Sequence, residues 1–182
     1  MRTRQIVYEV ATNQDLAATF MSVPTSDHGS TMAIDHSLTR MDAEILQDDT
    51  ITRWLSGLRA TLPASIAYLY PTINAYRRYQ QTQFNADVIC PSRSNNTELT
   101  HRLGSSDLNP YLGIGIVLAG GTVAIGNDLN PADSAGATPA LPESLDAAIN
   151  NLEHSNELAA VLDEDTITHW IEAQRLSIVL ND

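Results

Sequence analysis

The sequence predicts an α+β fold in which an antiparallel sheet is backed by helices. Two β-prone runs, residues 17–23 and 30–38, flank the turn-forming segment 24–29, which indicates two strands around a polar loop. From residue 49 onward, apolar residues recur at helical spacing in several segments, which indicates amphipathic helices. With 182 residues, 43% of them hydrophobic, the chain can form one packed domain or two small lobes.

The first element that we expect is a short helix over residues 4–13, which places Ile6, Val7 and Val10 on one face. This segment has no clear N-cap residue. After the two strands, a helix is expected from Asp49, with an apolar face that continues beyond Pro63 as a second helical stretch. The apolar residues of these two stretches are Ile51, Trp54, Leu55, Leu58, Leu62, Ile66, Leu69 and Tyr70.

The second half of the chain begins with weak periodicity over residues 80–103, which indicates two short strands and a loop. The apolar run 109–125 then predicts the most buried helix, with Asn109 as its N-cap and Pro110 in its first turn. A connection rich in Pro, Gly, Ala and Ser, residues 130–140, leads to two further helices. Their inner faces are formed by Leu145, Ala148, Ile149, Leu152, Ile167, Trp170 and Ile171.

Composition excludes several classes of function. The chain has 22 acidic and 10 basic residues, a net charge of −12, and every basic residue is arginine. A Walker-type phosphate loop and a Schiff-base mechanism both need lysine, and a nucleic-acid binder needs a basic stripe. Gly113 and Gly115 lack the third glycine of a dinucleotide fingerprint and are expected to allow close helix packing instead.

The single cysteine, Cys90, cannot form an intramolecular disulfide or a thiolate zinc site within this chain. A reducing compartment fits this usage. The N-terminus lacks the apolar core of a signal peptide, and the run 112–125 is too short and too glycine-rich to span a bilayer. We therefore expect a cytoplasmic protein that binds neither nucleic acid nor membrane.

Five short segments carry a resemblance to a known family. They are A-T-F-M-S-V-P at 18–24, H-G-S-T-M-A-I-D-H-S-L at 28–38, P-T-I-N-A-Y-R-R at 71–78, R-L-G-S-S-D-L-N-P-Y at 102–111 and W-I-E-A-Q-R at 170–175. In the same order, they resemble the A-T-F-M-x-K-P, N-G-S-G-M-H-x-H-x-S-L, P-x-x-N-S-Y-K-R, R-x-P-x-x-D-x-N-P-Y and W-I-x-x-K-R patterns of the glutamine synthetase family. The resemblance covers nearly the whole chain.

The resemblance implies a fold and an activity. Residues 1–182 are expected to form a single partial catalytic domain, its C-terminal portion, without the family's N-terminal β-grasp domain. The implied reaction is ATP-dependent ligation of ammonia or an amine, such as a polyamine, to the γ-carboxylate of glutamate, with Mg²⁺ or Mn²⁺ as cofactor. Strand edges left open in such a partial sheet favour a homo-oligomer or association with a full-length synthetase.

Four positions of the chain match functional residues of the family. Arg78 and Arg102 match arginines that bind glutamate and act in catalysis. Gly29 matches a backbone contact to glutamate, and Ser37 matches a serine on the nucleotide side. The resemblance therefore implies that these four residues form the substrate side of a site.

The metal positions of the family are not matched. Ala33 and Asp35 stand where the family has histidines, and Thr100 stands where it has a metal-binding glutamate. Glu98 lies two residues before Thr100, on the same face of an alternating strand. A relocated metal site of Asp35, His36 and Glu98 is one alternative. Because adjacent strand residues point to opposite faces, a solvated Asp35 and a structurally hydrogen-bonded His36 are the preferred interpretation.

Our hypothesis from the sequence is that the chain alone is catalytically inactive or nearly so, as a pseudoenzyme. Three classes stay open: an enzyme that is active only with a partner subunit, a non-catalytic relative that binds glutamate or associates with a full-length synthetase, and a fragment with no independent role.

Overall fold

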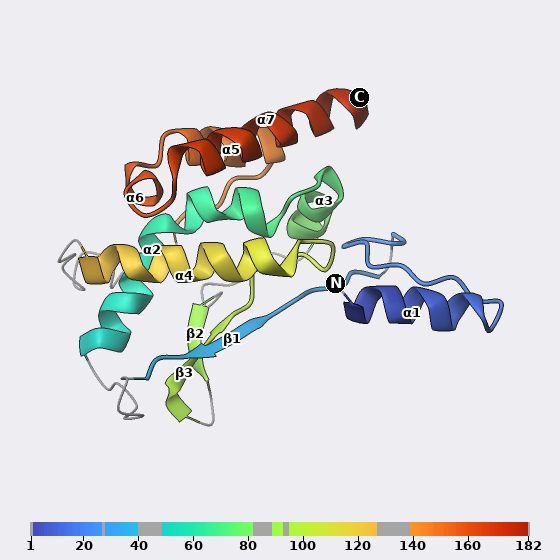
Figure 1. Ribbon diagram of the computed structural model, residues 1–182, viewed down its shortest axis with the longest axis horizontal. Helices are drawn as coiled ribbons and strands as arrows, with labels where there is room; N and C mark the ends of the chain where they lie inside the picture. Colours follow the sequence, from blue (N-terminus) through green and yellow to red (C-terminus); the bar gives the residue numbers. More distant parts are fainter. Residues whose placement is uncertain are drawn as a thin grey trace.

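A computed structural model describes residues 2–26, 28–39, 49–81, 89–92, 95–126 and 139–181. The three described strands form one sheet in the order β1-β3-β2. Figure 1 shows this sheet on one side of α2 and α4, with α5, α6 and α7 on the other side. The elements in chain order are α1 (Arg2–Thr12), β1 (Ile34–Ser37), α2 (Asp49–Leu69), α3 (Ile73–Gln81), β2 (Ile89–Ser92), β3 (Asn95–His101), α4 (Pro110–Gly126), α5 (Leu145–Glu153), α6 (Asn156–Ala159) and α7 (Glu164–Asn181).

The sheet is antiparallel throughout, which confirms the predicted α+β class and the two short strands expected within residues 80–103. Asp35 of β1 lies opposite Thr100 of β3, and Ser37 lies opposite Glu98. Because alternate strand residues point to opposite faces, these four share the outer face of the sheet. The residues between them face the core, and they are Ile34, His36, Leu99 and His101.

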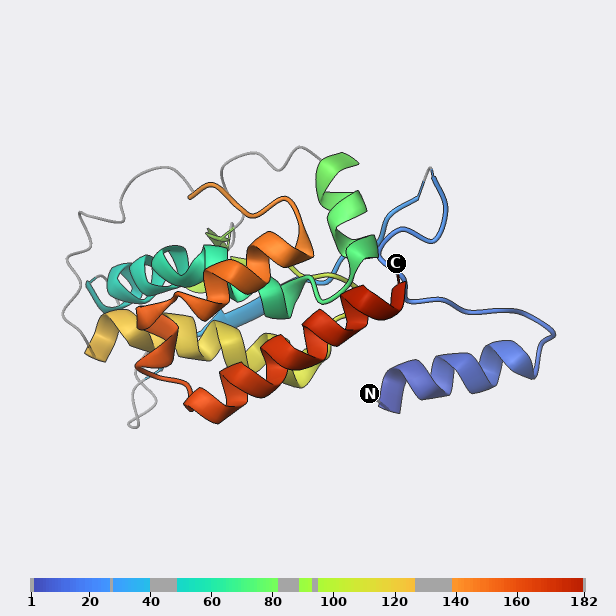
Figure 2. The same cartoon turned by 90° about the horizontal axis from the view of Figure 1, so that it is seen from above.

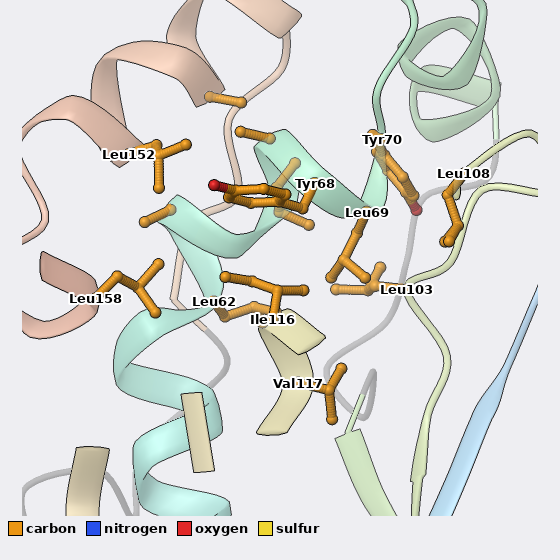
Figure 3. Packing of buried hydrophobic residues seen from close by; sticks show 14 of the residues in the cluster. Leu62, Tyr68, Leu69, Tyr70, Leu103, Leu108, Ile116, Val117, Leu152 and Leu158 are labelled. Carbon is orange, nitrogen blue, oxygen red and sulfur yellow. The ribbon is translucent and has the colours of Figure 1, made fainter. Parts of the chain in front are cut away.

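The core is built around α2, which continues as one helix through Pro63 where the sequence indicated two stretches. Figure 3 shows Leu62 and Leu69 of α2 among side chains from other elements. On α7, the Trp170 indole stacks on the Tyr68 ring with centroids 4.9 Å apart, and its N–H donates to the Ala67 carbonyl at 3.2 Å. The inner face predicted for the last helix is confirmed.

α2 and α4 cross closely because glycine lies at the contact on both helices. A Cβ atom added to Gly57 would lie 2.4 Å from the Gly120 carbonyl oxygen. A Cβ atom on Gly121 would lie 2.1 Å from the Trp54 ring. Any larger residue at these positions must therefore push the two helices apart.

α4 was expected to be the most buried helix, and this prediction is wrong, because one face of the helix is exposed. Gly113 is buried, and a Cβ there would lie 2.7 Å from the Leu108 side chain, whereas Gly115 is exposed with no neighbour within 4 Å. The helix has no charged residue, so the sequence gives no sign of an outward face. That face exposes Tyr111, Ile114, Leu118 and Ile125.

Residues 17–23 do not form the strand that the sequence predicts, and the second β-prone run is a strand only over β1. A β-prone run becomes a strand only when another strand pairs with it, and within the described residues no strand does so here. Instead, the Val23 N–H donates to Asn74 Oδ1 at 2.8 Å, and Asn74 Nδ2 donates to the Val23 carbonyl at 3.1 Å.

α1 confirms the predicted first helix but has no buried residue. Figure 2 shows it standing off from the other helices. One attachment is Arg4, whose guanidinium donates to the Leu108 carbonyl at 2.9 Å and lies over the Phe20 ring. The connection 130–140 lies almost entirely outside the described residues. None of the described helices has the length and apolarity that crossing a bilayer requires.

The predicted N-cap of α4 is confirmed, because the Tyr111 N–H donates to Asn109 Oδ1 at 3.0 Å. Asn109→Ala is expected to lower the free energy of unfolding by about 1 kcal/mol, since it leaves this N–H without its side-chain acceptor. Asn109→Asp keeps a cap acceptor and should change stability by much less. Urea unfolding followed by circular dichroism measures both variants, and equal losses would contradict the capping role.

Candidate functional site

The outer face of the β1–β3 pair carries most of the sequence-predicted positions. Ala33 directly precedes β1 and Arg102 directly follows β3, so both lie at the end of the pair marked by the opposed residues Ile34 and His101. Ser37 lies at the other end of β1, three residues beyond Ile34, which corresponds to about 10 Å along the strand. Both Ser37 and Arg102 are exposed. The structure thus places Ser37, which is predicted to face the nucleotide, and Arg102, one of the two predicted arginines, at opposite ends of the same strand pair.

Asp35, His36, Ser37, Glu98 and Thr100 line an open cavity of about 270 Å³ on this surface. The Thr100 hydroxyl, which stands at the family's metal-binding glutamate position, donates to Asp35 Oδ1 at 2.7 Å. Thr100 is therefore a hydrogen-bond donor to Asp35 where the family has an anionic ligand. Glu98 lies opposite Ser37, and its carboxylate would repel a phosphate bound there.

The residues present do not fit the divalent ions that the resemblance implies. Ala33 has no ligating atom, and within the described part of the chain no group of three or more His, Cys, Asp or Glu side chains could hold a metal ion. Asp35 and Glu98 are exposed carboxylates, and among the described residues no third His, Cys, Asp or Glu side chain completes a metal-binding group with them. The relocated metal site is therefore not supported, and we assign no metal-dependent step to these residues.

His36 points away from Asp35 and into the protein. Its Nε2 accepts a hydrogen bond from Trp54 Nε1 at 3.0 Å, which confirms the predicted structural role. Burial lowers the pKa of His36. The neighbouring inward-facing histidine, His101, is almost completely buried, and this burial lowers its pKa to about 3, with a smaller contribution from His36. Both rings are neutral at physiological pH.

Arg78 and Gly29, both predicted to bind glutamate, lie against each other. Arg78 is on α3 with 5% of its surface exposed, and Gly29 lies in the segment before β1. A Cβ atom on Gly29 would be 3.5 Å from both Cγ and Cδ of Arg78. Burial lowers the pKa of the Arg78 guanidinium, and the neighbouring Tyr70 hydroxyl partly offsets this effect. The aliphatic stem of Arg78 thus packs against the exposed Gly29 backbone, and a guanidinium at the end of such a stem suits a carboxylate ligand.

Little in the sequence points to the hydrogen-bonded residues that lie around this pair. Asp107 accepts hydrogen bonds from hydroxyls of Ser22, Thr72 and Ser105, which come from three separate segments. The helix α3 itself was not predicted. The available signals were Thr72, a good N-cap residue just before α3, and the turn-forming S-S-D sequence at 105–107.

Comparison with known proteins defines the class. Residues 1–178 match the sequence profile described as "Glutamine synthetase, catalytic domain". The chain therefore belongs to the glutamine synthetase family, as the sequence motifs indicated, and its fold is a partial catalytic domain of that family.

Among individual relatives, the glutamine synthetase of Mycolicibacterium smegmatis is 28% identical over 94% of this chain and 44% of its own length. The gamma-glutamylputrescine synthetase PuuA of Escherichia coli is 29% identical over 69% of this chain and 31% of its own length. The chain thus spans less than half the length of these curated relatives.

Two solved structures share the fold. One, described as "Apo GmaS without ligand", has a TM-score of 0.84 and 22% identity over 97% of this chain and 48% of that chain. The other, a novel glutamine synthase homolog, has a TM-score of 0.82 and 22% identity over 98% of this chain and 48% of that chain. At this identity, the two structures establish the fold alone.

Proposed function

We propose that this chain provides the glutamate-binding side of a glutamine synthetase-type ligase, and that by itself it binds glutamate without catalysing ligation. The observation that carries the proposal is the contact between buried Arg78 and the backbone at Gly29, because both match glutamate-side positions of the family. A guanidinium presents a planar set of donors that can bind a carboxylate through two parallel hydrogen bonds.

The absence of catalysis follows from the charge that the family's reaction must neutralise. ATP-dependent ligation passes through γ-glutamyl phosphate, and cations balance the charge on the transferred group. Ala33 and Thr100 provide no anionic or imidazole ligand for such cations. One lost preorganised contact costs about 3 kcal/mol of transition-state stabilisation, so the loss of several leaves little activity.

A second candidate is a catalytic role in association with other subunits. It is favoured by Ser37 and Arg102, which match functional positions of the family and are both exposed, so that a second polypeptide could reach them. In that assembly, which could be a homo-oligomer or a complex with a full-length synthetase, Ser37 would face the nucleotide and Arg102 the reacting groups. ATP and Mg²⁺ or Mn²⁺ would then be held largely by the partner.

Glutamate binding tests the proposal directly. Arg78→Lys is expected to weaken glutamate binding at least tenfold by isothermal titration calorimetry, because an ammonium cannot reproduce the paired contacts of a guanidinium. Arg77→Lys is the matched control: it is next to Arg78 on α3 but exposed, and it should leave the affinity unchanged. Circular dichroism checks that both variants are folded. Absence of glutamate binding by the wild-type chain would contradict the proposal.

Assays of γ-glutamyl hydroxamate formation with ATP and Mg²⁺ or Mn²⁺ separate the two candidates. No turnover by the lone chain is expected. Turnover by the lone chain would overturn the proposal of inactivity, whereas turnover that appears only when a full-length synthetase bearing an inactivated site is added would favour the second candidate.

A further inference from the structure

Three hydroxyl groups converge on the carboxylate of Asp107, and we call Asp107, Ser22, Thr72 and Ser105 the Asp107 clasp. Asp107 Oδ2 accepts a hydrogen bond from the Thr72 hydroxyl at 2.8 Å. Asp107 Oδ1 accepts from the Ser105 hydroxyl and from the Ser22 hydroxyl, the latter at 3.3 Å. The Ser22 and Ser105 hydroxyls are completely buried and also lie within hydrogen-bonding distance of each other, so the single proton of Ser22 is shared between Ser105 and Asp107. A carboxylate can accept all of these bonds because each oxygen has two lone-pair sites.

One arm of the clasp leads to the loop that contains Gly29. The carbonyl of Ser22 accepts a hydrogen bond from the Ser30 N–H at 2.8 Å. The same carbonyl would lie 3.4 Å from a Cβ atom on Gly29. The Ser30 hydroxyl bonds in turn to the Ser106 hydroxyl at 2.6 Å, next to Asp107 in the chain. The position of Ser22 therefore sets the position of the Gly29–Ser30 backbone.

The other arm leads to the helix that contains Arg78. Thr72 is the residue before α3, and while it donates to Asp107 its hydroxyl also accepts from the Ala75 N–H at 3.2 Å. Asn74, in the first turn of α3, adds two hydrogen bonds to the backbone of Val23, adjacent to Ser22. The Ser105 N–H donates to the Leu69 carbonyl at the end of α2, which ties the clasp to the core.

We infer that Asp107 is a positioning residue that holds the Gly29–Ser30 loop against Arg78. This inference rests on the proposed function, which makes Gly29 and Arg78 the glutamate site. The loop and α3 share no paired strand or common helix, so the clasp is a direct connection between them through buried, charge-assisted hydrogen bonds. Loss of the charged acceptor would leave buried hydroxyls competing for a single amide oxygen.

The test uses the isosteric variant Asp107→Asn and amide hydrogen exchange of the full chain. The Ser30 and Val23 amides, whose acceptors depend on the clasp, are expected to exchange at least tenfold faster than in the wild type. The Tyr70 amide, which donates to the Ile66 carbonyl at the end of α2, should keep its protection. Asp163→Asn is the matched control, since Asp163 caps only α7 through the Thr166 N–H.

A pair of variants at Thr72 separates positioning from general support. Thr72→Val removes the hydroxyl and is expected to weaken glutamate binding at least tenfold, whereas Thr72→Ser retains the hydroxyl and should restore wild-type affinity. Unchanged exchange at Ser30 and Val23 in Asp107→Asn, or an equal rise at Tyr70, would overturn the inference. If the wild-type chain binds no glutamate, the proposed function fails, while the exchange rates still decide whether Asp107 holds the loop.

Discussion

Gly121→Ala is expected to lower the free energy of unfolding by about 3 kcal/mol, near the upper end of the range for overpacked cores. The added methyl group would lie 2.1 Å from the Trp54 ring. The indole has little freedom to move, because it is buried and its Nε1 donates to His36. The α2–α4 contact must therefore open. Urea unfolding followed by circular dichroism at 222 nm measures the change.

The same helix provides the control. Gly115 is exposed, and a Cβ atom there meets nothing within 4 Å. Gly115→Ala should raise the free energy of unfolding by up to about 1 kcal/mol, because alanine loses less backbone entropy than glycine in a helix. Opposite signs for the two variants are expected. Equal effects would show that close packing of α2 and α4 does not decide the outcome.

The second large effect concerns pH and His101. Burial lowers the pKa of His101 to about 3 in the folded chain, whereas an unfolded histidine titrates near pH 6.5. Between these values the unfolded chain binds a proton that the folded chain does not. The contribution of His101 to the free energy of unfolding is therefore fully present above about pH 6.5 and is lost as the pH decreases toward 3. The slope from one such group is about 1.4 kcal/mol per pH unit. His36, whose pKa is also lowered, acts in the same direction.

His101→Leu is expected to remove most of this acid sensitivity. Between pH 6.5 and 4.5, the variant should lose about 2 kcal/mol less stability than the wild type, because the unfolded histidine is already half protonated at pH 6.5. At pH 7.5 it should be about as stable as the wild type, because His101 Nδ1 has no hydrogen-bond partner among the described residues and leucine leaves no buried polar group there. Urea midpoints across this pH range measure the difference, in which carboxylate titrations common to both chains cancel. Parallel pH profiles would contradict the assignment.

The sequence predicts well those elements whose signals are local. Asn109 and Pro110 mark the start of α4 correctly, since an N-cap depends only on its own turn. Strand alternation places Glu98 and Thr100 on one face without knowledge of the rest of the fold. The same alternation separates Asp35 from His36, so the structural role of His36 could be predicted as well.

The failures all depend on contacts between distant segments. The run 17–23 has β-prone residues, but a strand requires a partner, and its Val23 backbone is instead bonded by Asn74. The burial of α4 could not be predicted, because a helix without charges shows no outward face. The contact of Gly29 with Arg78 depends on Asp107, whose role involves three segments and leaves no periodic pattern. The family motifs named Gly29 and Arg78 without showing that they meet.

Because side chains alternate along β1 and β3, the residues at the family's metal positions lie on a different face of the sheet from the residues that form the core. The inward residues of β1 and β3 belong to the core, whereas Ala33 and Thr100, at the family's metal positions, lie outside it: Ala33 is exposed, and Thr100 is half-buried and donates to Asp35. The substitutions Ala33→His and Thr100→Glu would therefore restore the family's residue types at these positions without changing the packing of the core. For the same reason, substitutions at these two positions during evolution would have affected the stability of the fold little.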